Sequence, residues 1–117
     1  MELTTLAERI GATILTGPPP GRVEIRGVYA GDRISDLLNQ GNADTLLVTN
    51  LTGIQVLRVT ELMDVPALCL LDGAAPEPEL IRAAQQHDTV LLLSPLGMFE
   101  TCGRLYACLG AASEARV

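Results

Sequence analysis

The sequence predicts one compact α/β domain, in which a mostly parallel sheet of about five strands carries helices on both faces. Two short apolar runs, Ala67–Leu71 and Val90–Leu93, end in turn residues, and each is followed by a helical pattern. Successive strand–helix units are typical of a parallel sheet covered by helices. A third run, Thr45–Thr49, is continuously apolar, as expected for a strand buried on both faces. The 117 residues suit one domain with a sizeable core, so residues 1–117 are expected to fold together.

The remaining elements are predicted from helical periodicity, strand alternation and turn residues. Val23–Tyr29 alternates apolar and polar side chains, which favours a strand near a sheet edge. Gly110 is expected to end the last helix and Ala111–Val117 to fray after it. The predicted helices are Thr4–Ile10, Arg33–Gln40, a segment from Asn50 or Thr52 to Met63, Pro76–His87 and Pro95–Leu109, and Ala12–Leu15 is a further short strand.

Polar residues before these helices are expected to cap them, because their side chains accept hydrogen bonds from the first-turn N–H groups. In the last helix, the spacing of the apolar residues predicts a row of side chains that faces the core. The expected caps are Asp32, Asn50 or Thr52, and Ser94, and the expected core-facing residues of the last helix are Met98, Cys102, Leu105, Tyr106 and Leu109.

Charge and composition exclude several classes of function. The net charge is −6, the eight basic residues are all Arg, and Lys is absent. Without a basic stripe the chain is not expected to bind nucleic acid or an anionic membrane. Without Lys it has neither a P-loop lysine nor a Schiff-base lysine. The apolar runs fall far short of the ~20 residues that a membrane helix needs, and the N-terminus lacks the pattern of a signal peptide, so a cytoplasmic location is expected.

Cysteine and proline usage indicates structural roles. The odd number of cysteines has no disulfide-framework spacing. Cys69 is expected in the core, while Cys102 and Cys108 do not share a helix face. Gly17–Gly21 contains three consecutive prolines and is predicted to be a stiff surface loop. The alternative for this loop is a Pro-rich ligand for another protein.

The candidate site lies where the predicted strands end. In open parallel sheets, ligands bind outside the carboxyl ends of the strands, beside helix N-termini that favour anions. We therefore predict a site for a nucleotide or small anion there. The alternative is that these polar residues only cap their own helices. The candidate ligand-binding residues are Asp32, Asn50, Thr52, Gly73 and Ser94.

The sequence gives weaker support for a metal site or a catalytic site. Asp32, Asp36 and Asp72 could hold Mg²⁺ through their carboxylates, although nothing in the sequence fixes their separation. His87 is the only histidine; it lies in the last turn of its helix, where the dipole favours imidazolium. A structural role is expected for it, because the sequence shows no catalytic partner. Ser94 lacks a nucleophile-elbow frame, and no catalytic residue, cofactor or metal is predicted.

Four blocks of the sequence resemble the DRTGG domain family, over about Val28–Gly110. They are GVYAGDRISDLL, DTLLVTNLTGIQVLRVTELMDVPALCLLDG, APEPELIRAAQQHDTVLLLSP and LGMFETCGRLYACLG. DRTGG domains resemble the N-terminal domain of HPr kinase/phosphorylase and occur beside CBS pairs or catalytic domains. The resemblance implies a compact α/β fold with a regulatory role and no catalysis of its own. The chain departs from the family where Asp72-Gly73-Ala74 replaces a Gly-Gly turn, and it lacks the P-loop half of the kinase.

We therefore predict a non-catalytic regulatory domain that acts through self-association and through contact with a partner protein. A homodimer is expected because two-fold dimers are the commonest soluble oligomers. The alternative is a sensor domain that binds a nucleotide or small anion at the strand ends.

Overall fold

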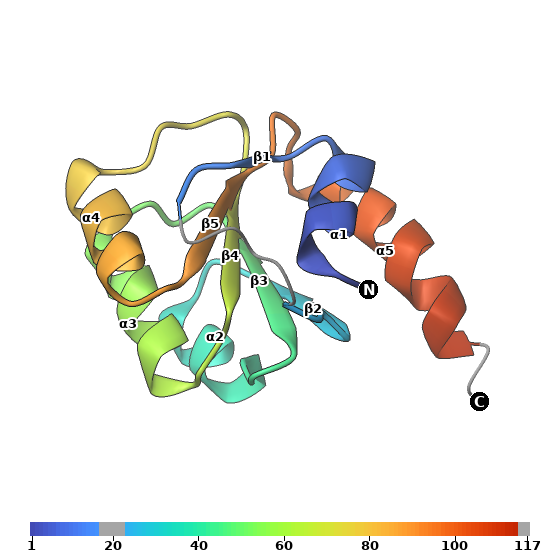
Figure 1. Cartoon of the computed structure of the whole chain (residues 1–117), viewed down its shortest axis with the longest axis horizontal. Coiled ribbons are helices and arrows are strands. Elements are labelled where there is room, and N and C mark those ends of the chain that lie inside the picture. The colour runs from blue at the N-terminus through green and yellow to red at the C-terminus, as the bar shows by residue number, and fades with distance from the viewer. Residues whose placement is uncertain (17–22, 115–117) are drawn as a thin grey trace.

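The computed structural model describes residues 1–16 and 23–114 and contains one five-stranded sheet with helices on both faces (Figure 1). The predicted Pro-rich loop and the last three residues lie outside the described ranges. The strands are β1 (Thr13–Ile14), β2 (Gly27–Ala30), β3 (Thr45–Thr49), β4 (Ala67–Leu70) and β5 (Val90–Leu93). The helices are α1 (Leu3–Ile10), α2 (Ile34–Gln40), α3 (Ile54–Leu62), α4 (Pro78–Gln86) and α5 (Met98–Glu114).

The sheet has the order β1-β5-β4-β3-β2, and its last four strands are parallel. β1 pairs antiparallel with β5. The register aligns Leu47, Leu68 and Leu91 across the three central strands. The mostly parallel sheet is thus confirmed, and β2 lies at an edge, as the alternation of Val23–Tyr29 predicts.

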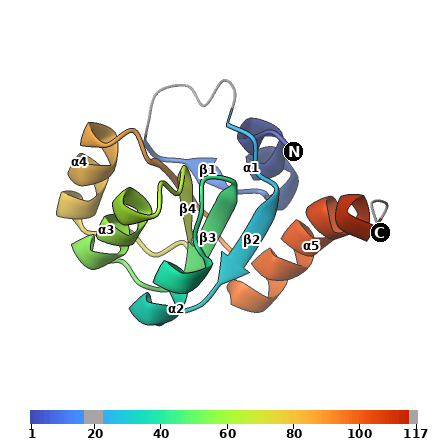
Figure 2. The ribbon, with the colours of Figure 1, turned by 90° about the horizontal axis from the view of Figure 1, so that it is seen from below.

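The helices form two layers, one made by the crossover connections between strands and one made by the two ends of the chain. Each connection from β2 to β5 moves one strand in the same direction, and right-handed crossovers therefore place α2, α3 and α4 on one face. The terminal helices α1 and α5 pack against each other and cover the other face (Figure 2). Helices on both faces are therefore confirmed.

Alternation along the buried strands divides the core between the two faces. Leu47, Leu68 and Leu91 pack with the crossover helices. Leu46, Cys69 and Leu92 pack with α1 and α5 on the other side. Because successive strand residues point to opposite faces, each central strand contributes to both layers.

The predicted caps and several boundaries are wrong. Arg33, Gly53 and Glu77 stand at the N-cap positions of α2, α3 and α4, and none makes a side-chain cap hydrogen bond. Pro78, not Pro76, begins α4. Helices α2 to α5 begin later than predicted. Asp32 accepts a hydrogen bond from the loop after β3 instead of from its own helix, whereas Ser94 accepts the N–H of Leu96 and contacts Thr101 of α5 without standing at the N-cap position.

The ends of β2 and α5 also differ from the prediction. The strand begins at Gly27, because upstream of it Glu24 forms an isolated antiparallel bridge with Glu2. The last helix continues through Gly110 to Glu114 instead of fraying after Leu109. An interior glycine costs a helix only about 1 kcal/mol relative to alanine, so it need not end one.

One predicted core residue of α5 faces outward. The buried row of this helix is Thr101, Leu105 and Leu109, spaced by four residues. Tyr106 is 66% exposed because it follows Leu105 and is therefore rotated by about 100° from that row. Within the described residues, no helix is long and apolar enough to cross a membrane.

The cysteines are free and differ in burial, which predicts selective labelling. Burial raises the pKa of the Cys69 thiol to about 12, so this thiol stays protonated and unreactive at pH 8. Burial also raises the pKa of Cys102. With iodoacetamide at pH 8, we expect Cys108 to react first, Cys102 more slowly, and Cys69 only in denaturant, as measured by mass spectrometry. Native labelling of Cys69 at the rate of Cys108 would contradict its buried position.

Candidate functional site

The structure brings Asp32 and Asn50 together at the carboxyl ends of β2 and β3. The Asn50 backbone N–H donates to Asp32 Oδ1 at 2.9 Å, and its side-chain amide donates to Oδ2 at 3.3 Å. The hydroxyl of Thr49 donates to Asp32 Oδ1 at 3.4 Å. The carboxylate therefore joins the loops after two neighbouring strands, and it does not cap α2.

A second junction forms between the ends of β4 and β5. The chain leaves β4 toward α4 on one face of the sheet and leaves β5 toward α5 on the other. Adjacent strands whose connections diverge in this way create a topological switch point, the usual ligand position in open α/β sheets. Gly73 and Ser94, two of the predicted site residues, lie at this switch point.

Backbone hydrogen bonds join the two loops of the switch point. The N–H of Asp72 donates to the Leu96 carbonyl, and the N–H of Gly73 donates to the Ser94 carbonyl, each at 2.9 Å. Asp72 and Gly73 both have positive φ, of 59° and 61°. This left-handed turn directs both amides at the neighbouring loop, so in this conformation neither amide is free to bind an anion.

Ser94 is fully buried and bonds to α5. Its Oγ lies 2.8 Å from Thr101 Oγ1 and accepts the N–H of Leu96 at 3.2 Å. The Thr101 hydroxyl donates to the Leu96 carbonyl at 3.4 Å, so the Ser94 hydroxyl donates to Thr101. This closed ring of hydrogen bonds fixes the first turn of α5 against the end of β5.

Thr52 is the remaining candidate residue, and its backbone links two loops at the carboxyl edge of the sheet. The Thr52 carbonyl accepts the N–H of Glu77 at 3.5 Å, which connects the loop after β3 to the start of α4. The predicted site residues thus form two bonded pairs, Asp32 with Asn50 and Gly73 with Ser94. Among the described residues, no three His, Cys, Asp or Glu side chains form a group that could hold a metal ion, so Asp32, Asp36 and Asp72 do not converge.

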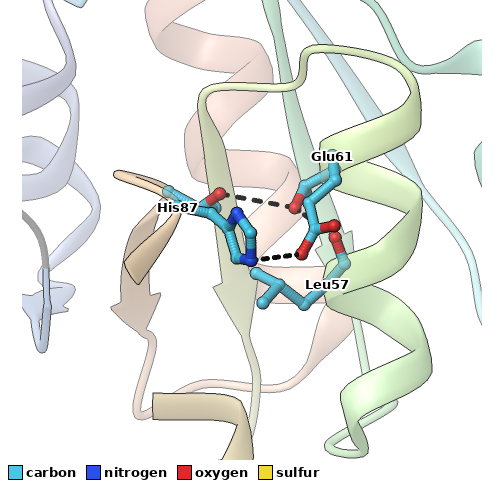
Figure 3. A network of polar contacts seen from close by, with 5 residues as sticks. Leu57, Glu61 and His87 are labelled. Carbon is cyan, nitrogen blue, oxygen red and sulfur yellow. Dashed lines mark hydrogen bonds and ion pairs between the residues drawn. The ribbon is translucent and has the colours of Figure 1, made fainter. Parts of the chain in front are cut away.

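A polar hollow lies at the opposite edge, where the chain enters β4 and β5. It has a volume of about 370 Å³. Its wall includes an ion pair between His87 Nε2 and Glu61 Oε1, 3.2 Å apart, which joins the ends of α4 and α3 (Figure 3). The lining residues are Thr60, Glu61, Asp64, Val65, Pro66, His87, Asp88 and Thr89.

Hydrogen bonds of buried threonines connect residues that line this hollow to the strands of the sheet. The Thr60 hydroxyl donates to the Leu57 carbonyl at 2.6 Å and lies 3.4 Å from the Thr89 hydroxyl. Thr16 donates to the Thr89 carbonyl and accepts the N–H of Leu91. These bonds hold the ends of α3, β1 and β5 together.

The partner of His87 is the polar residue that sequence reasoning missed. The signal is present in the topology: consecutive crossover helices on one face end side by side, so a carboxylate in the last turn of one can meet a histidine at the end of the next. Sequence spacing alone does not show this, because Glu61 and His87 are separated by a strand. The ion pair is about half exposed, at 37% and 49%, which suits a modest structural contact.

Comparison with known proteins places the fold. No protein-family model and no curated protein matches the chain. A solved structure, the CBS and DRTGG domains of the regulatory region of Clostridium perfringens pyrophosphatase in complex with its activator diadenosine tetraphosphate, matches with a TM-score of 0.70 and 14% identity. This chain shares its fold with part of that regulatory region. The match covers 89% of this chain but 45% of the other, so the present chain spans less than half of its length.

Proposed function

We propose that this chain is a non-catalytic, DRTGG-like regulatory domain that acts by binding a second copy of itself and a partner protein. The observation that carries the proposal is the internal bonding of the sheet's carboxyl edge, where enzymes of this architecture place their reactive groups. Asp32 is bonded to Asn50, and Ser94 is bonded to Thr101. Large apolar side chains, by contrast, are exposed on α5.

The hydroxyl groups at this edge lack the features of a nucleophile. Thr49 donates to a carboxylate, as an activated hydroxyl would, but it is fully buried. Ser94 is also fully buried and donates to another hydroxyl, not to a base. A nucleophile must reach both a base and a substrate, so this arrangement supports a structural role for both residues.

The alternative function is a sensor that binds a nucleotide or small anion. The structural neighbour is a regulatory region complexed with a dinucleotide activator. The N-termini of α3 and α4 both open at the carboxyl edge, and neither N-cap residue makes a side-chain cap bond. The Glu77 carboxylate lies beside Gly53, at the N-terminus of α3. The positive ends of these helices favour an anion at Thr52 and Gly73 in place of that carboxylate, provided that the loop bonds of Gly73 open.

Thermal unfolding in the presence of nucleotides separates the two functions. We expect the melting temperature of the wild-type chain to stay unchanged with millimolar ATP, ADP, AMP, diadenosine tetraphosphate or inorganic phosphate. A ligand at 100 times its Kd would add about 2.7 kcal/mol to the free energy of unfolding. A clear stabilisation by one of these ligands that disappears in Thr52→Val but not in Glu61→Gln, at the opposite edge, would favour the sensor over the interaction domain.

The self-association has its own measurement. Light scattering across concentration should give twice the chain mass of 12.4 kDa in the absence of any nucleotide. A chain that remains a monomer at every concentration and gains a second copy only with one nucleotide would move the sensor ahead.

A further inference from the structure

The outward face of α5 carries two exposed aromatic side chains in one line. Phe99 is 91% exposed and Tyr106 is 66% exposed. They are seven residues apart, which is two helical turns, so they project from nearly the same side. Gly103 lies between them, and a Cβ there would meet no atom within 4 Å. The face therefore carries two large aromatic side chains on either side of a glycine, and the Tyr106 ring lies against Gly110.

Two oppositely charged residues lie beside the aromatic pair and are centred on the same point of the helix. Glu100 and Arg104 are both exposed, and they follow each other at i, i+4 along one flank of the helix. The Arg104 guanidinium extends toward Gly11, at the end of α1. The midpoint of the aromatic pair and the midpoint of the charged pair both fall at residues 102–103. Along this flank, an acidic residue therefore precedes this point and a basic residue follows it at about the same distance.

We propose that α5 packs antiparallel against α5 of a second copy of this chain, across a two-fold axis near Gly103. This arrangement places Phe99 beside Tyr106 of the partner subunit. It places Glu100 beside Arg104 of the partner subunit once that guanidinium turns away from Gly11 of its own chain. A two-fold interface must be self-complementary, and the alternation of charge along this flank meets that requirement. The inference rests on the self-association in the proposed function and adds the surface that performs it.

The position of α5 in the fold leaves this face open to a second helix. Its opposite side, which carries Thr101, Leu105 and Leu109, packs on the core. The C-terminal half of α5 extends beyond the rest of the domain in Figure 2. A glycine at the crossing point lets two helices approach closely, which brings the flanking aromatic and charged residues within contact distance.

Cysteine crosslinking tests the position of the axis. Gly103→Cys is placed in a chain with Cys102→Ser and Cys108→Ser, and the reduced protein is oxidised in air. The two engineered thiols should form a disulfide between copies, because such a bond requires Cα atoms within about 7 Å of each other. Arg58→Cys in the same background, exposed on α3, is the matched control and should remain largely uncrosslinked. No excess of covalent dimer for Gly103→Cys over the control would overturn the proposed axis.

Side-chain substitutions test the contacts. Phe99→Ser should raise the dimer dissociation constant at least about tenfold, because buried aromatic anchors dominate interface affinity. The control Leu62→Ser removes a side chain that is 73% exposed on α3 and should leave dissociation unchanged. Glu100→Arg alone should weaken the dimer, and adding Arg104→Glu should restore it. Unchanged melting temperatures under monomeric conditions show that these exposed positions do not disturb the fold.

The contrary outcomes separate this interface from the proposed function. A dimer that is indifferent to Phe99→Ser would overturn the α5 interface while leaving self-association intact through another surface. A chain that is monomeric at every concentration would overturn both the interface and the self-association. The nucleotide experiment would then decide between a partner-binding domain and a sensor.

Discussion

Leu68→Ala should lower the free energy of unfolding by about 3–5 kcal/mol, one of the largest effects expected of a side-chain truncation in this chain. Leu68 is fully buried in β4, the middle strand of the sheet. Its register partners Leu47 and Leu91 are fully buried too, and all three pack under the crossover helices. Removing its side chain loses apolar burial and leaves a cavity that strands paired on both sides cannot close.

Leu62→Ala is the matched control for this result. The same atoms are removed, but Leu62 is 73% exposed at the end of α3, so the change should stay within about 0.5 kcal/mol. Urea unfolding followed by circular dichroism gives both values. Equal losses for the two variants would contradict the central position of β4 in the core.

Ser94→Ala should cost about 1–3 kcal/mol, because it leaves buried polar groups without their partner. The Leu96 N–H loses its acceptor, and the Thr101 hydroxyl loses its donor. Denaturant unfolding measures the loss. The exposed Ser35→Ala in α2 is the control and should change the free energy of unfolding by less than about 0.5 kcal/mol.

A double-mutant cycle separates this hydrogen bond from the burial of the two side chains. Thr101→Val keeps the shape of Thr101 but removes its hydroxyl. The two substitutions together should cost less than the sum of the single losses, with a coupling of about 0.5–3 kcal/mol. Additive losses would mean that the 2.8 Å contact between the two hydroxyls contributes nothing to stability.

The local pattern of the chain determines the parts of the fold that depend on burial. Thr45–Thr49 and Val90–Leu93 have the predicted bounds, because strands buried on both faces are continuously apolar and end sharply at polar residues. The parallel sheet follows from the alternation of such strands with helices. The edge position of β2 agrees with the half-polar alternation of Val23–Tyr29, although only Gly27–Tyr29 of that segment lies in the strand.

The roles of the polar residues depend on partners that are distant in sequence. Asp32 has the residue type of an N-cap, yet it bonds to Asn50, because the ends of parallel strands bring several loops to one edge. Ser94 instead contacts Thr101 in the helix that follows it, seven residues on. His87 meets Glu61 only because successive right-handed crossovers place α3 and α4 side by side.

The sequence by itself therefore determined the class of the fold, the central strands, the apolar core and the edge at which the candidate residues gather. Only the tertiary structure decided which residues bond to one another there, where α5 ends and which of its sides faces outward. The physical reason is that burial is encoded by local periodicity, whereas a hydrogen bond or an exposed helix face depends on what the rest of the chain brings alongside it.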